Sequence, residues 1–434
     1  MNSGGEGPFG PGRYAVSGKR RAKAAGQRTD AGTKWIVLVL MGADNPSNQT
    51  DLLTFAKGDI KEMEQALAAR TSPRRLEIAI QLHRKGGVTR RHLPRAPQEV
   101  PGELGDAVDG TPLFEFVRWA LPATGYRPGD RVMLVLWGHA HKFAIGAQPV
   151  ERGEDALDFA ELVDVLGRLK EPQAGERMAT LERFDIIAFD ACDASTLEMA
   201  YQLHPFTRYL LASQIRIPLP GFPYRRMLQR LAVPQGRLMG PAEFGRWAVR
   251  RFCEFYSVAP DDKDTVSLTL LDVQQAPAVT EAAGRLAAVL GDRISDTTED
   301  LDFVKQVFRL SRTIDRVDPA RRLKPFVDLA DLCLNLLLGC ASDDVKQAAR
   351  ALGDMLLSPA PVRGGKSETG RGYPFIVEHG RNACTTARLN GVSVYAPHVA
   401  GAASDFDEMN GRYQNFRFAQ ETLWAALVTT MTES

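Results

Sequence analysis

The first apolar run of the chain reads Trp35-Ile36-Val37-Leu38-Val39-Leu40-Met41, and turn residues follow it at 42–48. The run is short, partly β-branched and free of polar alternation, which predicts a strand buried on both faces. Because only helices above and below a sheet can cover both faces of such a strand, the run favours an α/β fold.

Strands and helices are predicted to alternate along the following two hundred residues. Further strand candidates lie at 76–82, 132–137, 184–189 and 207–212, and the first is mixed enough to be expected nearer an edge of the sheet. Apolar residues at helical spacing predict helices at 51–69, 112–121, 157–169 and 194–203. Alternation of this kind needs crossover connections, so we predict a mainly parallel sheet flanked by helices over residues 35–235.

The two ends of the chain differ from this part. Residues 1–34 are Gly-rich and basic and lack apolar periodicity, so we predict a disordered tail. Residues 236–434 are predicted to be mostly helical with short strands. The expected helices are 241–256, 274–290, 300–312, 323–338 and 343–357, and the expected strands lie near 265–271, 372–377 and 391–396.

Composition narrows the class of protein. Lys and Arg number 54 against 53 Asp and Glu, so the net charge indicates no nucleic-acid partner. No apolar run reaches 18 residues and no signal peptide is visible, so neither membrane association nor secretion is expected, and we predict a cytoplasmic protein. The five cysteines form no Cys-x-x-Cys pair, which predicts free thiols and no metal site.

Two chemically active side chains follow two of the predicted strands. His139 comes just after the strand at 132–137, and Cys192 comes just after the strand at 184–189. The carboxyl ends of parallel strands meet at one edge of a sheet, so we expect an imidazole and a thiol to meet there. We predict Cys192 as nucleophile and His139 as base, with His141 as a rival base. The backbone N–H groups of Ala140 and Cys192 are the predicted oxyanion donors.

The same segments carry a family resemblance. The strand ending in Asp190-Ala191-Cys192, the segment ending in Trp137-Gly138-His139, and the opening strand with Gly42-Ala43-Asp44-Asn45 are similar to motifs of the clostripain-like cysteine peptidases. Weaker similarities extend this resemblance to Trp424. It implies a caspase-type fold and peptide hydrolysis by a Cys–His dyad through a thioester acyl-enzyme, with a protein or peptide as substrate.

The resemblance also implies finer properties. Family members typically cut after Arg or Lys, with Asp190 lining the pocket, although Asp190 as a cap of the following helix is an equal alternative. Ser213 falls in a matching segment and is a candidate substrate-binding residue. Some relatives cut themselves after the histidine motif, and here Arg152 is the candidate site. Calcium dependence is known in the family, but no Asp-x-Asp-x-Asp-Gly loop occurs here, so no cofactor is predicted.

Three positions depart from the family pattern. Ala140 replaces a glycine, Asp193 replaces an apolar residue, and Pro220 stands where a second acidic pocket residue is usual. Loss of that carboxylate weakens the expected preference for basic residues. These departures favour an alternative, a catalytically silent scaffold that binds a partner protein, with the C-terminal region as a candidate regulatory surface. A nucleotide-binding domain is disfavoured because no Gly-x-Gly-x-x-Gly motif follows the first strand.

Overall fold

The computed structural model of the chain describes the following residues: 34–43, 52–69, 75–84, 86–100, 110–141, 143–146, 156–171, 181–232, 239–258, 265–311, 325–357, 362–363, 366–367, 374–382, 389–397 and 411–433. They all belong to the unit Thr33–Ser434, one of two units into which the chain divides. The other unit, Met1–Gly32, lies outside the described residues, so the disordered tail at 1–34 stays a prediction.

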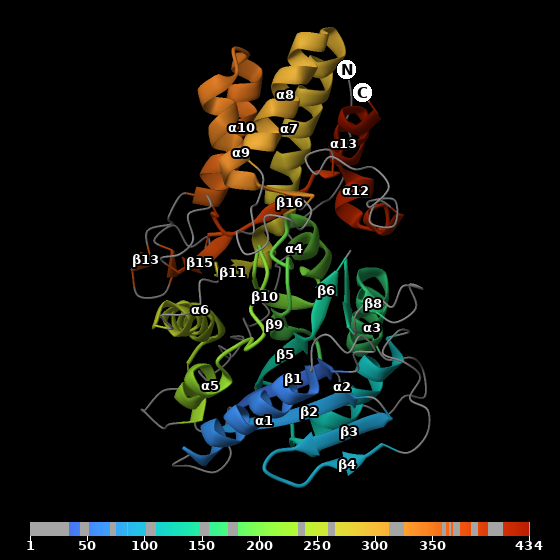
Figure 1. Ribbon diagram of the computed structural model, residues 1–434, viewed down its shortest axis with the longest axis vertical. Helices are drawn as coiled ribbons and strands as arrows, with labels where there is room; N and C mark the ends of the chain where they lie inside the picture. The colour runs from blue at the N-terminus through green and yellow to red at the C-terminus, as the bar shows by residue number, and fades with distance from the viewer. Residues whose placement is uncertain are drawn as a thin grey trace, which may run out of the picture. The chain divides into compact units, whose positions relative to one another are not determined.

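Nine of the described strands form one sheet, in the order β15-β11-β10-β9-β5-β1-β2-β3-β4 (Figure 1). They are β1 (Trp35–Gly42), β2 (Leu76–Arg84), β3 (Gly87–His92), β4 (Gln98–Glu99), β5 (Arg131–Trp137), β9 (Phe184–Asp190), β10 (Thr207–Ala212), β11 (Ser267–Asp272) and β15 (Ile376–Arg381). The inner strands from β10 to β2 pair in parallel, and the outer pairs are antiparallel. The predicted mainly parallel sheet is confirmed.

Helices cover both faces of this sheet. Ile36 and Leu38 of β1 share a buried cluster with α2 (Thr111–Ala123), α3 (Phe159–Lys170), α4 (Leu197–Leu203) and α7 (Ala276–Asp296). Val37 and Val39 point the other way and share a cluster with α1 (Leu52–Ala68), α5 (Tyr224–Ala232) and α6 (Pro241–Val258). Successive residues of a strand face opposite sides, so an apolar strand is the expected consequence of two covered faces.

Local sequence explains where some of these helices begin. The side chain of Asp158 accepts a hydrogen bond from the Glu161 N–H at 2.9 Å, and Glu161 accepts one from the Asp158 N–H at 2.9 Å. This capping box satisfies two backbone donors at the start of α3. In α1 the buried positions Leu52, Ala56 and Met63 recur at helical spacing and form the stripe that packs on the sheet.

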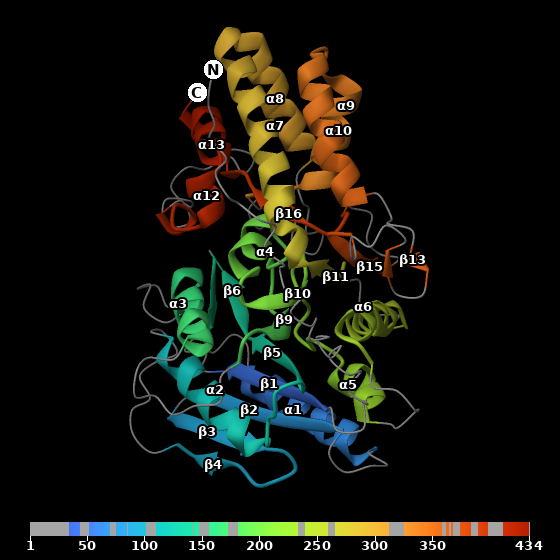
Figure 2. The same ribbon diagram turned by 180° about the vertical axis from the view of Figure 1, so that it is seen from behind.

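The C-terminal half contributes to the same sheet. Strands β11 and β15 lie in residues 236–434 and extend the sheet beyond β10, so the predicted parts 35–235 and 236–434 share one sheet. This half is mostly helical, with α8 (Thr298–Leu310), α9 (Leu329–Gly339), α10 (Asp343–Leu357), α12 (Arg417–Glu421), α13 (Trp424–Glu433) and the 3-10 helix η3 (Val273–Gln275). Figures 1 and 2 show α7, α8, α9 and α10 side by side.

Smaller sheets complete the described structure. They are β6 (His139–His141), β7 (Ala144–Gly146) and β8 (Ala156–Asp158) in one, β12 (Phe326–Asp328) with β16 (Ser393–Tyr395) in another, and β13 (Val362–Arg363) with β14 (Lys366–Ser367) in a third. The hairpin β6–β7 follows β5 directly and carries the predicted base. Within the described ranges, none of the helices combines the length and the hydropathy of a transmembrane span.

Candidate active site

The strands that precede the two predicted catalytic residues are direct neighbours. β5 and β9 pair in parallel, with Trp137 opposite Asp190 at their carboxyl ends. Just beyond, the Gly138 N–H donates to the Asp190 carbonyl oxygen at 3.3 Å. The backbone therefore brings the segment that leads to His139 beside the segment that leads to Cys192, as the parallel topology predicts.

His139 opens the β6–β7 hairpin and is half-buried. Its Nε2 atom is covered and makes no hydrogen bond to any described residue. Burial disfavours the charged imidazolium, so the pKa of His139 lies below its ordinary value of 6.5. The imidazole is therefore neutral at neutral pH and has a nitrogen that can accept a proton, which is the state a general base needs.

Cys192 lies in the turn between β9 and α4 and is half-buried. The next residue, Asp193, has φ of 57°, in the left-handed region that non-glycine residues seldom enter. Its N–H donates to the Ile215 carbonyl at 3.2 Å, which holds the turn in this shape. The prediction that the helix begins at residue 194 is wrong, because α4 begins at Leu197 with Thr196 as its N-cap.

Asp190 is buried beneath this turn, with only 4% of its surface exposed. Its carboxylate accepts the Phe222 N–H at 3.0 and 3.1 Å and the Tyr224 hydroxyl at 2.9 Å. The capping alternative is therefore wrong, since Thr196 caps α4 and Asp190 binds the loop before α5. Gly221 in that loop has φ of 62°, and a Cβ there would lie 2.9 Å from Oδ2 of Asp190, so only glycine fits.

A second carboxyl, that of Asp59 in α1, lies near Asp190 and was not among the predicted site residues. It accepts the Trp137 Nε1–H at 2.7 Å and is buried. Burial raises the pKa of Asp59, and repulsion by Asp190 raises it further. Burial likewise raises the pKa of Asp190, against the opposing effect of its hydrogen bonds. The spacing of Asp59 within the apolar stripe of α1 was the signal that could have revealed it.

The remaining predicted residues fall in different settings. Ser213 is fully buried, and its hydroxyl lies 3.2 Å from that of Ser267 and accepts the Ile215 N–H at 3.2 Å. Ala140 lies opposite Ile145 in the β6–β7 hairpin. The side chain of His141 and the whole of Arg152 lie outside the described residues. The dyad, the oxyanion donors and the substrate-binding residues stay predictions.

Among the described residues, no group of three or more His, Cys, Asp or Glu side chains is placed to hold a metal ion. The Asp59 carboxyl accepts the Trp137 N–H, and the Asp190 carboxyl accepts the Phe222 N–H and the Tyr224 hydroxyl, so both have hydrogen-bond donors as partners.

Comparisons with known proteins agree with this architecture. The chain is similar to the structure of an inactive zymogen C11 protease from Parabacteroides distasonis, with 14% identity and a TM-score of 0.60 over 90% of this chain and 98% of that one. It is also similar to a secreted C11 cysteine protease from Bacteroides thetaiotaomicron in complex with an irreversible peptide inhibitor. There the identity is 16% and the TM-score 0.59, over 91% of this chain and 99% of that one. These likenesses show the fold.

Similarity in sequence indicates the family to which the chain belongs. A search among curated proteins gave no match. The model of the family described as the Clostripain family matches residues 39–333, which is more than half of the chain. The chain therefore belongs to the clostripain family of cysteine peptidases.

Proposed function

We propose that the protein is a cysteine endopeptidase that uses Cys192 and His139 as a dyad. The observation that carries this proposal is the buried Nε2 atom of His139, which has no hydrogen-bond partner among the described residues. His139 follows β5, and β5 pairs with β9, the strand that leads to Cys192. A neutral imidazole without a partner is suited to take the proton of a nearby thiol.

The reaction proceeds in two halves. His139 takes the Cys192 proton, and the thiolate attacks the peptide carbonyl carbon, while the N–H groups of Ala140 and Cys192 stabilise the oxyanion. As the C–N bond breaks, the imidazolium returns its proton to the leaving amine and a thioester remains. His139 then takes a proton from water as the water oxygen attacks the thioester carbonyl; the C–S bond breaks, the carboxylic acid product leaves, and the imidazolium returns its proton to the Cys192 thiolate.

The test is selective alkylation and peptide cleavage. Iodoacetamide at neutral pH is expected to label Cys192 first, and Cys192→Ala is expected to lose both the labelling and all cleavage of a peptide library. Cys253 is the matched control, because it is also half-buried but burial raises the pKa of its thiol to about 12. Cys253→Ala should retain activity. A folded wild type that cleaves nothing would instead favour the silent scaffold, which Asp193, Ala140 and Pro220 suggest.

Cleavage after Arg or Lys is the proposed specificity. Asp190 is the last residue of β9 and its carboxyl is buried, and a desolvated carboxylate pairs well with a basic side chain. The hydrogen bonds that Asp190 accepts from Phe222 and Tyr224, and the absence of a second acid at Pro220, argue for a modest preference. Library cleavage by wild type and Asp190→Asn measures it: the basic preference should fall in the variant, and an unchanged preference removes Asp190 from the pocket.

Self-cleavage after Arg152 is proposed as activation. Residues 147–155 connect β7 and β8, which pair with one another, so a cut there leaves both strands in their small sheet. Purified wild type is expected to become two fragments as activity rises, while Arg152→Ala and Cys192→Ala remain single chains. A fully active wild type that stays intact contradicts this proposal.

A further inference from the structure

The tip of the hairpin that carries His139 is an aromatic residue in an unusual conformation. Phe143 follows β6 with φ of 60°, a left-handed value that a bulky side chain rarely adopts. The residue is nevertheless buried, with only 7% of its surface exposed. A strained backbone of this kind persists only where surrounding contacts impose it, so the contacts of the ring hold the hairpin tip in place.

Those contacts come mainly from the C-terminal part of the chain. The Phe143 ring centroid lies 5.0 Å from that of Phe416 and 5.3 Å from that of Tyr395, with interplanar angles of 60° and 69°. Phe326 packs edge-on at 5.7 Å, and Tyr413 lies at 6.2 Å. Aromatic pairs prefer tilted and edge-to-face geometry at these separations, so the ring is seated in a fitted cluster.

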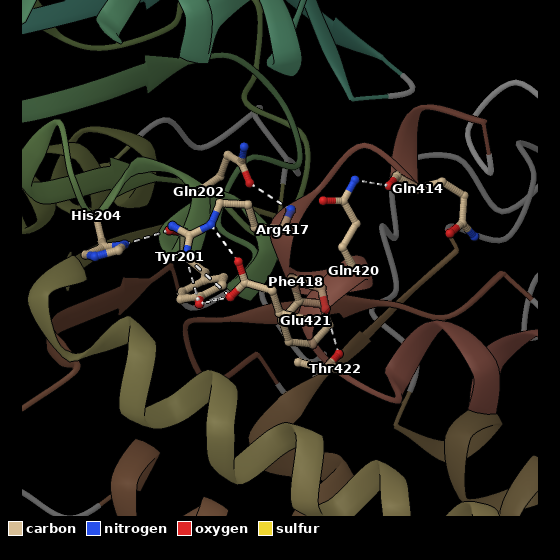
Figure 3. Close-up of polar contacts among 9 residues, drawn as sticks. All are labelled: Tyr201, Gln202, His204, Gln414, Arg417, Phe418, Gln420, Glu421 and Thr422. Atoms are coloured by element: carbon tan, nitrogen blue, oxygen red, sulfur yellow. Dashed lines mark hydrogen bonds and ion pairs between the residues drawn. The ribbon is translucent and has the colours of Figure 1, made fainter. Parts of the chain in front are cut away.

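The segment that supplies Tyr413 and Phe416 continues into α12, which is bound to α4 (Figure 3). The Arg417 N–H donates to the Gln202 side chain at 3.0 Å, and the Arg417 guanidinium lies 4.6 Å from the centre of the Tyr201 ring. The Tyr201 hydroxyl donates to Glu421, which also accepts from Arg417 at 2.9 Å. Residues 413–421, here called the C-terminal brace, are thereby fixed to the helix that follows the Cys192 turn.

A neighbouring segment holds the turn itself. The Ser195 hydroxyl donates to the Gly391 carbonyl at 2.7 Å, and the Ser393 N–H donates to the Ser195 carbonyl at 2.9 Å. Ser393 begins β16, whose Tyr395 also contacts the Phe143 ring. The C-terminal region therefore touches both the residues just after Cys192 and the tip of the hairpin that begins at His139.

We infer that the C-terminal brace positions the imidazole of His139 against Cys192, with Phe143 and Phe416 as positioning residues. This inference rests on the proposed function. The contacts of the brace described above are with Phe143 and with α4, so its loss should leave the chemistry in place but misalign it. A small displacement of a base from its nucleophile lowers the rate of the chemical step more than it weakens substrate binding.

The experiment compares Phe143→Leu, Phe143→Ala and Phe416→Leu with wild type. The expected result is a loss of tenfold or more in kcat with KM within about twofold. The pH dependence of Cys192 alkylation by iodoacetamide should shift towards that of His139→Ala, because the misplaced imidazole no longer takes the thiol proton. Purely structural damage would lower the yield of folded protein without moving that pH profile.

Two controls keep the outcomes distinct. Phe308→Leu changes a fully buried ring in α8 that packs on Trp424, and it should leave kcat and the alkylation profile unchanged. Folded Phe143→Ala and Phe416→Leu with wild-type kcat and profile would overturn the inference while Cys192→Ala remains inactive. If Cys192→Ala is itself fully active, the proposed function fails and the inference fails with it.

Discussion

The two sides of the candidate site are held by different kinds of contact. On the cysteine side, backbone hydrogen bonds surround the turn: Asp193 donates to Ile215 at 3.2 Å and Ser195 donates to Ser213 at 2.9 Å. On the histidine side, the hairpin tip is held by one ring, that of Phe143, which packs in an aromatic cluster. Backbone hydrogen bonds shape the cysteine turn, whereas at the hairpin tip ring packing is added to the pairing of β6 with β7.

This difference has a mechanical consequence. Several hydrogen bonds to separate partners share the task of shaping the cysteine turn, so the loss of one leaves the others. A single ring that fills a cluster has no substitute, and its truncation leaves a cavity. The geometry of the nucleophile should therefore tolerate point changes better than the geometry of the base, and three further measurements around the two strand ends sharpen this comparison.

The largest effect is expected at Asp190, where the cysteine side depends on one buried carboxyl. Asp190→Ala leaves the Phe222 N–H and the Tyr224 hydroxyl without an acceptor. Each buried unpaired group costs about 1–3 kcal/mol, so the free energy of unfolding should fall by roughly 2–6 kcal/mol. Urea unfolding measures this. Asp190→Asn keeps an acceptor oxygen and should lose clearly less; equal losses in both variants would contradict this account.

A pH-dependent effect is expected at Asp59. Burial and the neighbouring Asp190 raise the pKa of Asp59 in the folded protein above its ordinary value of 3.8. A raised pKa means that the folded state binds the proton more tightly. The stability this provides is complete below pH 3.8 and is lost as the pH rises through the raised pKa.

Asp59→Asn is the variant that isolates this proton. It keeps an acceptor for the Trp137 N–H and cannot ionise, so its stability should decline less than that of wild type as the pH rises. The difference should grow by up to about 1.4 kcal/mol per pH unit. Thermal unfolding across the neutral and mildly alkaline range checks this, and parallel curves for the two proteins would show that Asp59 does not titrate as described.

The smallest effect is expected at Ser195. Ser195→Ala removes the bond to the Gly391 carbonyl but keeps both backbone bonds, so unfolding should become easier by only about 1 kcal/mol and kcat should change little. Ser257→Ala, which removes an exposed helix hydroxyl bonded to the Cys253 carbonyl, is the matched control and should change stability by less than about 0.5 kcal/mol. A large loss of kcat in Ser195→Ala would show that the cysteine side is not redundant.

Much of the central architecture followed from local pattern. The run at 35–41 predicted a strand covered on both faces, and β1 is covered by α1 on one side and α2 on the other. Most helix positions agreed within a few residues because apolar spacing reports one buried stripe per helix. The helix predicted at 323–338 is wrong at its start, because Phe326–Asp328 forms β12, which pairs with β16, and α9 begins only at Leu329. The predicted start of α4 was too early because Ala194 and Ser195 look helical, whereas the Ser195 N–H donates to the Ser213 carbonyl and the Ser195 carbonyl accepts the Ser393 N–H.

Other features depend on partners remote in the sequence. Nothing near Asp59 shows that its helix will place it beside Asp190, and the sequence around β11 does not reveal that it extends the main sheet. The small hairpin β6–β7 has strands too short for a periodic signal. Phe143 alone reads as a loop residue, and its role emerges only when Phe416 packs against it.

By itself, the sequence determined the alternation of strands and helices and the positions of His139 and Cys192 after neighbouring strands, since periodicity and chain order are local properties. Tertiary structure alone decided which carboxyls are buried together and which ring anchors the base. Burial energies and hydrogen-bond partners depend on contacts that form only after segments distant in the sequence have packed together. Local sequence patterns do not show which distant segments come into contact.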